Sequence, residues 1–374
     1  MGFGNVTQAR AAVDAVDGYR AGVVGTGFMG DVHSRAIRAT RGSLVGIVGS
    51  SAERTAAAVT QFAPERAVTD LDELVTVDDI NVIHVCTPNH LHEPQALAAL
   101  KAGKHVVCEK PLAPSAAAAA ELVAAATEHG RVATVPFVYR FHPMVREARE
   151  RVRRGDLGRL HLAHGGYLQD WLLLPSDDNW RVDPRVGGPS RAFGDIGSHW
   201  CDLLEFVTGD RVARVSAQAS KTNPERGGRA VTTEDIVTLQ FVTTRGIVGT
   251  SVISQVSPGR KNRLLLEVSG SGGTVAFDQE QPELLWNGRR EESALLVRDP
   301  DTLSAPAARY ARVPAGHAQG YQDCFNAFVA DTAAAIAGEE PDGLPTFADG
   351  LRAARIAEAV LASAQAHAWV EVEP

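Results

Sequence analysis

What this sequence has little of already excludes several classes of protein. Its four cysteines are scattered over 374 residues, which argues against a disulfide framework or a metal site and predicts free thiols. Basic residues number 37 against 45 acidic ones, so the net charge is −8 and neither nucleic acid nor an anionic membrane is an expected partner. The sequence also lacks an apolar run near the roughly 20 residues of a membrane span. Because the N-terminus has no apolar signal core, we expect a cytoplasmic protein.

What the sequence does have is the length and composition of a two-domain globular protein. A chain of 374 residues is too long for one ordinary core, and 44% apolar with 22% charged residues is typical of globular proteins. We expect a lead over residues 1–18, which is either a short helix at Val6–Val16 or without order. A first domain over residues 19–138 and a second over residues 139–374 should follow.

The first domain is organised around a glycine-rich loop between a strand and a helix. The apolar run Ala21–Val24 leads into Gly25-Thr26-Gly27-Phe28-Met29-Gly30, and a helical stretch, Asp31–Ala39, follows. In a dinucleotide-binding loop the first glycine allows the tight turn, the second lets the backbone approach a pyrophosphate, and the third lets the helix pack on the strand. The helix N-terminus offers free N–H groups to the phosphates. A glycine-rich turn without a ligand is the alternative. The flanking strand and helix favour a ligand held by Gly25, Gly27, Phe28, Met29 and Gly30.

Strands and helices alternate through the rest of the first domain. The predicted strands are Leu44–Val48, Val82–Val85, His105–Cys108 and Val132–Val135, and the predicted helices are Leu71–Leu74, Pro94–Ala102 and Ala116–Glu128. This alternation predicts a doubly wound parallel sheet of the Rossmann type. Ligands bind such sheets beyond the carboxyl ends of the strands, so Gly25, Ser50, Thr87 and Lys110 should share one crevice.

The end of the second strand bears on the choice between NAD and NADP. An NAD site usually has an acidic residue there for the ribose, whereas an arginine accommodates the 2′-phosphate of NADP. This chain has Ser50 and Ser51, and Arg54 stands one turn on. The pattern favours NADP over NAD, although Ser51 and Arg54 could equally be a helix cap and a solvated first-turn residue.

The second domain has longer strands and few helices. After a basic helix at His142–Arg154, the predicted strands are Leu160–Tyr167, Val212–Ala219, Ile236–Val242, Ile247–Ile253 and Leu264–Val268. One strong helix, Ile196–Val207, interrupts them, and two more, Gln319–Ile336 and Phe347–His367, end the chain. The pattern predicts an α+β domain with a large, mostly antiparallel, open-faced sheet. The helix over residues 347–367 could pack back on the first domain.

Two groups are candidates for proton transfer. Lys110 follows a buried strand and precedes a proline, so its backbone is held extended at the crevice. Asp195 and His199 are four residues apart and should share one helix face, where the pair could accept a proton from a hydroxyl. The alternatives are a surface lysine, and an N-cap aspartate with an ordinary polar histidine. A carboxylate at this spacing is expected to raise the pKa of His199.

Four motifs together are far more specific than the glycine pattern. They are Glu109-Lys110-Pro111, Thr87-Pro88-Asn89-x-x-His92, Tyr139-Arg140-Phe141-x-Pro143 and Asp195-x-x-x-His199. With these motifs the chain resembles the glucose–fructose oxidoreductase, inositol dehydrogenase and MocA family over nearly its whole length, from Tyr19 onward.

The resemblance implies NAD or NADP between the domains and a sugar, cyclitol or related polyol as the small-molecule substrate. Lys110 and His199 would transfer protons, with Asp195 orienting His199 and binding a substrate hydroxyl. Glu109 and the loop of Thr87, Pro88, Asn89 and His92 would lie along the cofactor, and Tyr139 and Arg140 at the crossover would lie near the substrate. The family assembles through the open sheet face, so a homodimer or homotetramer is expected.

Further substrate contacts and two other functions remain open. Trp171, Asn179, Trp180 and Arg181 lie where the family has specificity loops, and His317 and Tyr321 could close the site or simply cap and pack a helix. A hydride-transferring dehydrogenase is the first hypothesis. The alternatives are an NAD-dependent glycosidase of the same family and a dinucleotide-binding sensor without chemistry. The intact Lys110, Asp195 and His199 argue against the sensor.

Overall fold

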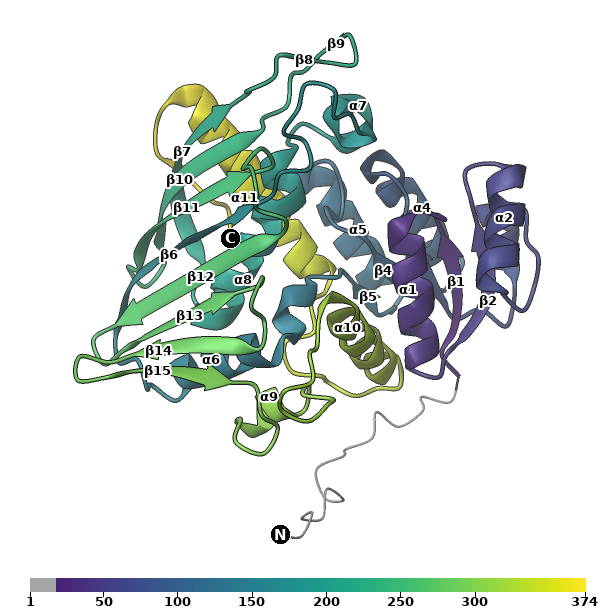
Figure 1. The fold of residues 1–374 in the computed structure, drawn as a ribbon. Coiled ribbons are helices and arrows are strands. Elements are labelled where there is room, and N and C mark those ends of the chain that lie inside the picture. Colours follow the sequence, from purple (N-terminus) through teal and green to yellow (C-terminus); the bar gives the residue numbers. More distant parts are fainter. Residues whose placement is uncertain (1–17) are drawn as a thin grey trace.

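The computed structural model describes residues 18–374, and the possible helix at Val6–Val16 lies outside them. The described chain forms a parallel sheet and a larger, mostly antiparallel sheet, each covered by helices (Figure 1), which confirms the predicted fold class.

The parallel sheet has five strands in the order β2-β1-β3-β4-β5. Its strands are β1 (Arg20–Val24), β2 (Ser43–Val48), β3 (Val82–Val85), β4 (His105–Cys108) and β5 (Ala133–Thr134). Their apolar side chains are buried, as expected when helices cover both faces of a parallel sheet. The helices are α1 (Phe28–Ala39), α2 (Ala52–Phe62), α3 (Leu71–Thr76), η1 (Asn89–Leu91), α4 (His92–Lys101) and α5 (Ala116–Glu128). Helix α2 is not among the predicted helices, although the sequence indicates Ser51 and Arg54 as a possible cap and first-turn residue; of its residues Thr55, Ala58 and Phe62 are buried.

The second sheet has nine strands in the order β15-β14-β13-β12-β6-β11-β10-β7-β16. They are β6 (Leu160–Leu168), β7 (Val212–Ser220), β10 (Ile236–Thr243), β11 (Val248–Ser254), β12 (Arg263–Gly270), β13 (Thr274–Asp278), β14 (Leu284–Gly288), β15 (Ser293–Val297) and β16 (Val370–Glu371). Among the described strands of this sheet, β6 and β11 pair in parallel and the other neighbours pair antiparallel. A separate hairpin joins β8 (Glu225–Arg226) and β9 (Arg229–Ala230).

Helices cover one face of this sheet and leave the other open (Figure 1). The helical segments of this half are η2 (Val138–Phe141), α6 (Pro143–Arg153), η3 (Trp180–Val182), α7 (Pro184–Gly187), η4 (Phe193–Gly197), α8 (Ser198–Thr208), α9 (Ala305–Ala308), α10 (Tyr321–Ile336) and α11 (Phe347–Ala366). The apolar stripe of α8, which includes Trp200, Leu203 and Leu204, is buried against the sheet as its spacing predicts.

Both C-terminal helices pack back on the first domain. Helix α10 lies beside α1, where Phe325 and Phe328 join the core under the parallel sheet. Helix α11 packs on α5 as well as on β7, and the Glu358 carboxylate accepts a hydrogen bond from the Ala116 backbone N–H at 2.7 Å. This packing brings the first residue of α10, Tyr321, to the edge between the domains. No helix within residues 18–374 is both long and apolar enough to cross a membrane.

Candidate active site

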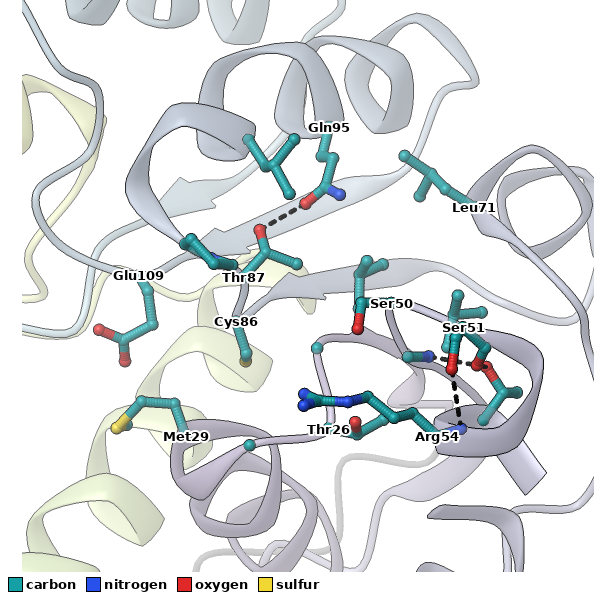
Figure 2. A pocket seen from close by; sticks show the side chains of 18 of the residues that line it. Thr26, Met29, Ser50, Ser51, Arg54, Leu71, Cys86, Thr87, Gln95 and Glu109 are labelled. Carbon is teal, nitrogen blue, oxygen red and sulfur yellow. Dashed lines mark hydrogen bonds between the residues drawn. The ribbon is translucent and has the colours of Figure 1, made fainter. Parts of the chain in front are cut away.

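A crevice of about 1130 Å³ runs along the carboxyl ends of the parallel strands. Gly25, Ser50, Thr87 and Lys110, which follow β1, β2, β3 and β4, all line it, so the strand ends that the sequence grouped together do meet. Figure 2 shows the side chains of Ser50, Thr87 and Glu109 among those around the crevice.

The glycine loop after β1 brings the backbone to the edge of the crevice. Gly25 has φ +106°, and a Cβ there would lie 2.4 Å from the Cys86 carbonyl oxygen. A Cβ on Gly30 would lie 2.1 Å from the Gly25 carbonyl oxygen, so both glycines are required by the fold itself. Around a Cβ on Gly27, in contrast, no described atom lies within 4 Å. Gly27 is the N-cap of α1 without a side-chain cap, so the free N–H groups of α1 are available to an anion.

The far end of the crevice is lined by Ser50, Ser51 and Arg54. The Ser51 hydroxyl accepts a hydrogen bond from the Arg54 backbone N–H at 3.3 Å and caps α2. The Arg54 guanidinium nevertheless lines the crevice and forms no salt bridge with any residue of the range 18–374 (Figure 2). The helix cap and the anion-binding role are therefore compatible.

The loop after β3 is tied to its neighbours by side chains. The Asn89 amide donates to the Gly187 carbonyl at 2.7 Å. The two ring nitrogens of His92 each lie 2.8 Å from a carbonyl oxygen, one of Thr87 and one of Pro111. His92 thus joins the loops that follow β3 and β4, and both loops line the crevice.

A second cavity of about 470 Å³ adjoins the crevice. Four residues line both: Phe28, Lys110, Arg181 and Tyr321. The other residues around the second cavity are Tyr139, Tyr167, Gln169, Trp171, Asp195, Ile196, His199 and Asn262. Lys110, Asp195 and His199, which are distant in sequence, thus meet at the junction of the two cavities.

The carboxylate of Asp195 binds Lys110 rather than His199. Its Oδ1 lies 2.6 Å from Lys110 Nζ, and its Oδ2 accepts a hydrogen bond from Gln255 Nε2 at 2.9 Å. Burial alone would raise the pKa of Asp195, but the charges of Lys110 and Arg181 outweigh it and hold the pKa well below its usual range. The alternative reading of Asp195 as an N-cap does not hold, since Asp195 lies inside the widened π-helical turn η4.

His199 is a buried histidine. Its ring lies edge-on to Phe137 and Tyr139, with centroid distances of 5.7 and 5.0 Å, and its Nδ1 has no hydrogen-bond partner among the described residues. Burial and the charge of Lys110 lower the pKa of His199 well below its ordinary value, against the opposing effect of Asp195. The expectation of a raised pKa is therefore wrong, because burial outweighs the carboxylate.

One wall of the second cavity is a chain of hydrogen-bonded polar side chains. The hydroxyls of Tyr139 and Tyr167 bond to each other, and Tyr167 donates to Asn262 Oδ1 at 2.6 Å. Gln169 donates to the same oxygen at 2.8 Å and accepts from the Trp171 indole N–H, also at 2.8 Å. Sequence reasoning missed Tyr167, Gln169 and Asn262. The alternation Tyr167-x-Gln169-x-Trp171, which continues one face of β6, is the signal that could have found two of them.

Some predicted substrate residues do not reach the second cavity. The Arg140 guanidinium is buried in ion pairs with Asp202 and Asp349, the first at 2.8 Å from Nε to Oδ2, which leaves it as a link between elements of the fold. His317 is exposed in the loop before α10 and lines neither cavity. Trp180 and Asn179 line the crevice along the strand ends, where the Arg181 guanidinium lies 4.2 Å from the Trp180 ring centroid.

Comparisons with known proteins agree with this geometry. Residues 19–137 match the family model "Oxidoreductase family, NAD-binding Rossmann fold", and residues 145–276 match "GFO/IDH/MocA C-terminal domain". A levoglucosan dehydrogenase from Pseudarthrobacter phenanthrenivorans is 31% identical, over 94% of this chain and 97% of its own. A solved structure of levoglucosan dehydrogenase in complex with NADH and levoglucosan has a TM-score of 0.89 at 29% identity, over 95% of this chain and 99% of that one. An oxidoreductase domain protein from Kribbella flavida has a TM-score of 0.87 at 35% identity, over 95% and 99% of the two chains. The chain therefore belongs to the GFO/IDH/MocA family of oxidoreductases, with an NAD-binding Rossmann domain.

Proposed function

We propose that the protein transfers a hydride between a hydroxyl of a sugar, cyclitol or related polyol, or its keto form, and a nicotinamide dinucleotide. The observation that carries this is the position of Lys110, which lines both cavities and holds Asp195 beside His199. The likeness to a levoglucosan dehydrogenase supports the substrate class.

The side chains at the junction divide the proton chemistry between them. Neutral His199 accepts the proton of the substrate hydroxyl, since its lowered pKa keeps it unprotonated near neutral pH. The Lys110 ammonium stabilises the negative charge that develops on the oxygen, and Asp195 fixes the ammonium in place. A dinucleotide bound in the crevice would accept the hydride from the substrate carbon. The polar wall of Tyr167, Gln169 and Asn262 binds the remaining hydroxyls.

For the cofactor we propose NADP in preference to NAD. The supporting feature is the end of β2, where no carboxylate follows the strand directly and the Arg54 guanidinium lines the crevice. The solved relative that contains NADH is the reason to measure both cofactors side by side.

The test is a substrate screen with both cofactors. Absorbance of the reduced nicotinamide should rise with a member of a panel of sugars, cyclitols and polyols that includes levoglucosan. Lys110→Ala should lower kcat by ~10²-fold or more while dinucleotide binding persists. A flat absorbance with cleavage of a chromogenic glycoside would identify an NAD-dependent glycosidase instead. Dinucleotide binding with neither reaction would identify a sensor.

We further propose a homodimer or homotetramer that uses the open face of the nine-stranded sheet. Large apolar side chains are exposed on four of its strands: Leu162, Val248, Val252, Trp286, Leu295 and Val297. Light scattering on the purified protein tests this, and a monomer at micromolar concentration would contradict it.

A further inference from the structure

A chain of buried titratable side chains crosses the first domain beneath the crevice. The Tyr19 hydroxyl lies 2.7 Å from His84 Nε2, His84 Nδ1 lies 2.8 Å from His33 Nδ1, and His33 Nε2 lies 3.0 Å from Glu109 Oε1. Tyr19 precedes β1 at the amino edge of the sheet, and Glu109 follows β4 at the carboxyl edge. All four side chains are at least nine-tenths buried, and nothing in the proposed proton transfer uses the first three.

The hydrogen atoms of this chain can be placed in one consistent direction. Within residues 18–374 the Tyr19 hydroxyl has no hydrogen-bond partner other than His84, so a Tyr19 that accepted from His84 would bury its own O–H without an acceptor. Tyr19 therefore donates to His84, His84 donates to His33, and His33 donates to Glu109. Every N–H and O–H is then satisfied with both histidines neutral, and the chain ends on an acceptor.

The acceptor at the end of the chain is the Glu109 carboxylate, which forms no salt bridge with a lysine or arginine among residues 18–374. Burial raises the pKa of Glu109, but the hydrogen bond from His33 and the nearby charges outweigh it and lower the pKa below its usual value. The titratable groups that interact electrostatically with Glu109 are His33, His92, Lys110, Cys86, Cys108 and Tyr321. Of these, Lys110 is the cation, and its ammonium is bound to Asp195 rather than to Glu109.

Glu109 lies at the end of the crevice where the reacting ring must bind. Its neighbour Lys110 lines both cavities, and Glu109 lines the crevice beside it (Figure 2). A dinucleotide whose phosphates lie at Gly27 can present its nicotinamide to the second cavity only at this end. The oxidised nicotinamide ring carries a positive charge and the reduced ring does not, so a fixed carboxylate here distinguishes the two states.

We propose that Tyr19, His84 and His33 hold an ionised Glu109 carboxylate at the nicotinamide end of the crevice, where it favours binding of the oxidised over the reduced cofactor. The three buried residues are positioning residues in this arrangement, and Glu109 is the group that faces the cofactor. The inference rests on the proposed function, since it takes the crevice to be the dinucleotide site.

The test compares the dissociation constants of the oxidised and reduced dinucleotides by fluorescence titration, without turnover. Glu109→Gln keeps the shape and removes the charge. This change should raise the ratio of the dissociation constant of the oxidised dinucleotide to that of the reduced dinucleotide by about tenfold, as expected for loss of one charge a few ångströms away. Tyr19→Phe removes only the hydroxyl that sets the direction of the chain. It should shift the ratio the same way by about two- to threefold.

Tyr310→Phe is the matched control. The Tyr310 hydroxyl is also buried and donates to a carboxylate, Asp331 Oδ2 at 2.6 Å, but it lines neither cavity. It should lower the thermal midpoint as Tyr19→Phe does and leave the ratio unchanged. Infrared spectra of wild type against Glu109→Gln should show loss of a carboxylate stretch.

Three outcomes would overturn the inference. The first is an infrared band of a protonated carboxylic acid at Glu109. The second is an equal loss of affinity for the oxidised and reduced dinucleotides in Glu109→Gln. The third is a ratio of the two dissociation constants that is the same in Tyr19→Phe as in Tyr310→Phe. Each leaves the proposed function standing. A wild-type protein that binds neither dinucleotide would instead remove the proposed function together with the inference.

Discussion

Of the two adjoining cavities of this protein, one is formed largely by the backbone and the other by side chains. At the glycine loop the crevice is formed by backbone and small residues, with Gly25 and Gly30 in contacts too close for any Cβ and Gly27 with no described atom near its Cβ position. The second cavity is walled by large side chains that hydrogen-bond to one another, such as Tyr167, Gln169 and Asn262. A phosphate is recognised through backbone N–H groups, whereas the hydroxyls of a particular sugar require particular side chains. We therefore expect changes in the crevice to affect all substrates and changes in the polar wall to affect selectivity.

Gly27→Val should have the largest effect on dinucleotide binding. It tests whether the crevice recognises its ligand through the backbone. A Cβ at this position has no described atom within 4 Å, so the fold should persist. If the phosphates lie at Gly27 as proposed, the valine fills the space that they need, and dinucleotide binding should become undetectable. Gly30→Val is the contrast, because its Cβ would meet the Gly25 carbonyl and should prevent folding. Fluorescence titration and thermal melting separate the two effects. Tight binding by Gly27→Val would place the phosphates elsewhere.

His199→Asn should cost ~10²–10⁴-fold in kcat, as for a lost general base. The group must be neutral to accept a proton, so kcat/KM for oxidation rises with pH through its pKa. Since the pKa of His199 is lowered by burial and by Lys110, this rise should lie below the ~6.5 of a free histidine. The pH profile of the wild type and the variant is the measurement. A rise that survives in His199→Asn would assign the titration to another group.

Arg54→Asp sharpens the comparison at the far end of the crevice, where a side chain rather than the backbone is proposed to recognise the ligand. Loss of a charge-assisted contact of ~1.5–3 kcal/mol should weaken NADP binding by ~10–100-fold and affect NAD far less. Dissociation constants for both cofactors test this. Equal changes in the dissociation constants of NADP and NAD would mean that Arg54 does not bind the 2′-phosphate and is only a solvated residue in the first turn of α2.

Gln169→Leu should have the smallest effect of the four. Removing one neutral hydrogen-bonding group of ~0.5–1.5 kcal/mol should lower kcat/KM for the best substrate by up to about tenfold. The dissociation constant of the dinucleotide should not change, since Gln169 does not line the crevice. A change in cofactor affinity as large as the change in kcat/KM would mean that the two cavities are not separate in function.

Much of the first domain could be predicted because its signals are local. The bounds of β3, β4 and α5 coincide with the predicted strands and helix, and the motifs at their ends lie where a parallel sheet brings strand ends together. In the second domain β13, β14 and β15 were missed. Each is five residues long, and turns rich in glycine and charge separate them, so their apolar pattern is too short to stand out.

The sequence by itself was enough to predict the fold class and the glycine loop and to single out Lys110, Asp195 and His199 as candidates. These predictions depend on patterns among neighbouring residues in the chain. Only the tertiary structure decided how the three residues are paired. Asp195 bonds to Lys110, which is 85 positions away, and burial lowers the pKa of His199 that the local spacing would raise. The chain from Tyr19 to Glu109 is likewise formed by residues that are far apart in sequence: His33 in α1, His84 in β3, Tyr19 just before β1 and Glu109 just after β4. Desolvation and hydrogen bonding between distant residues depend on what folding brings together, and no local pattern records that.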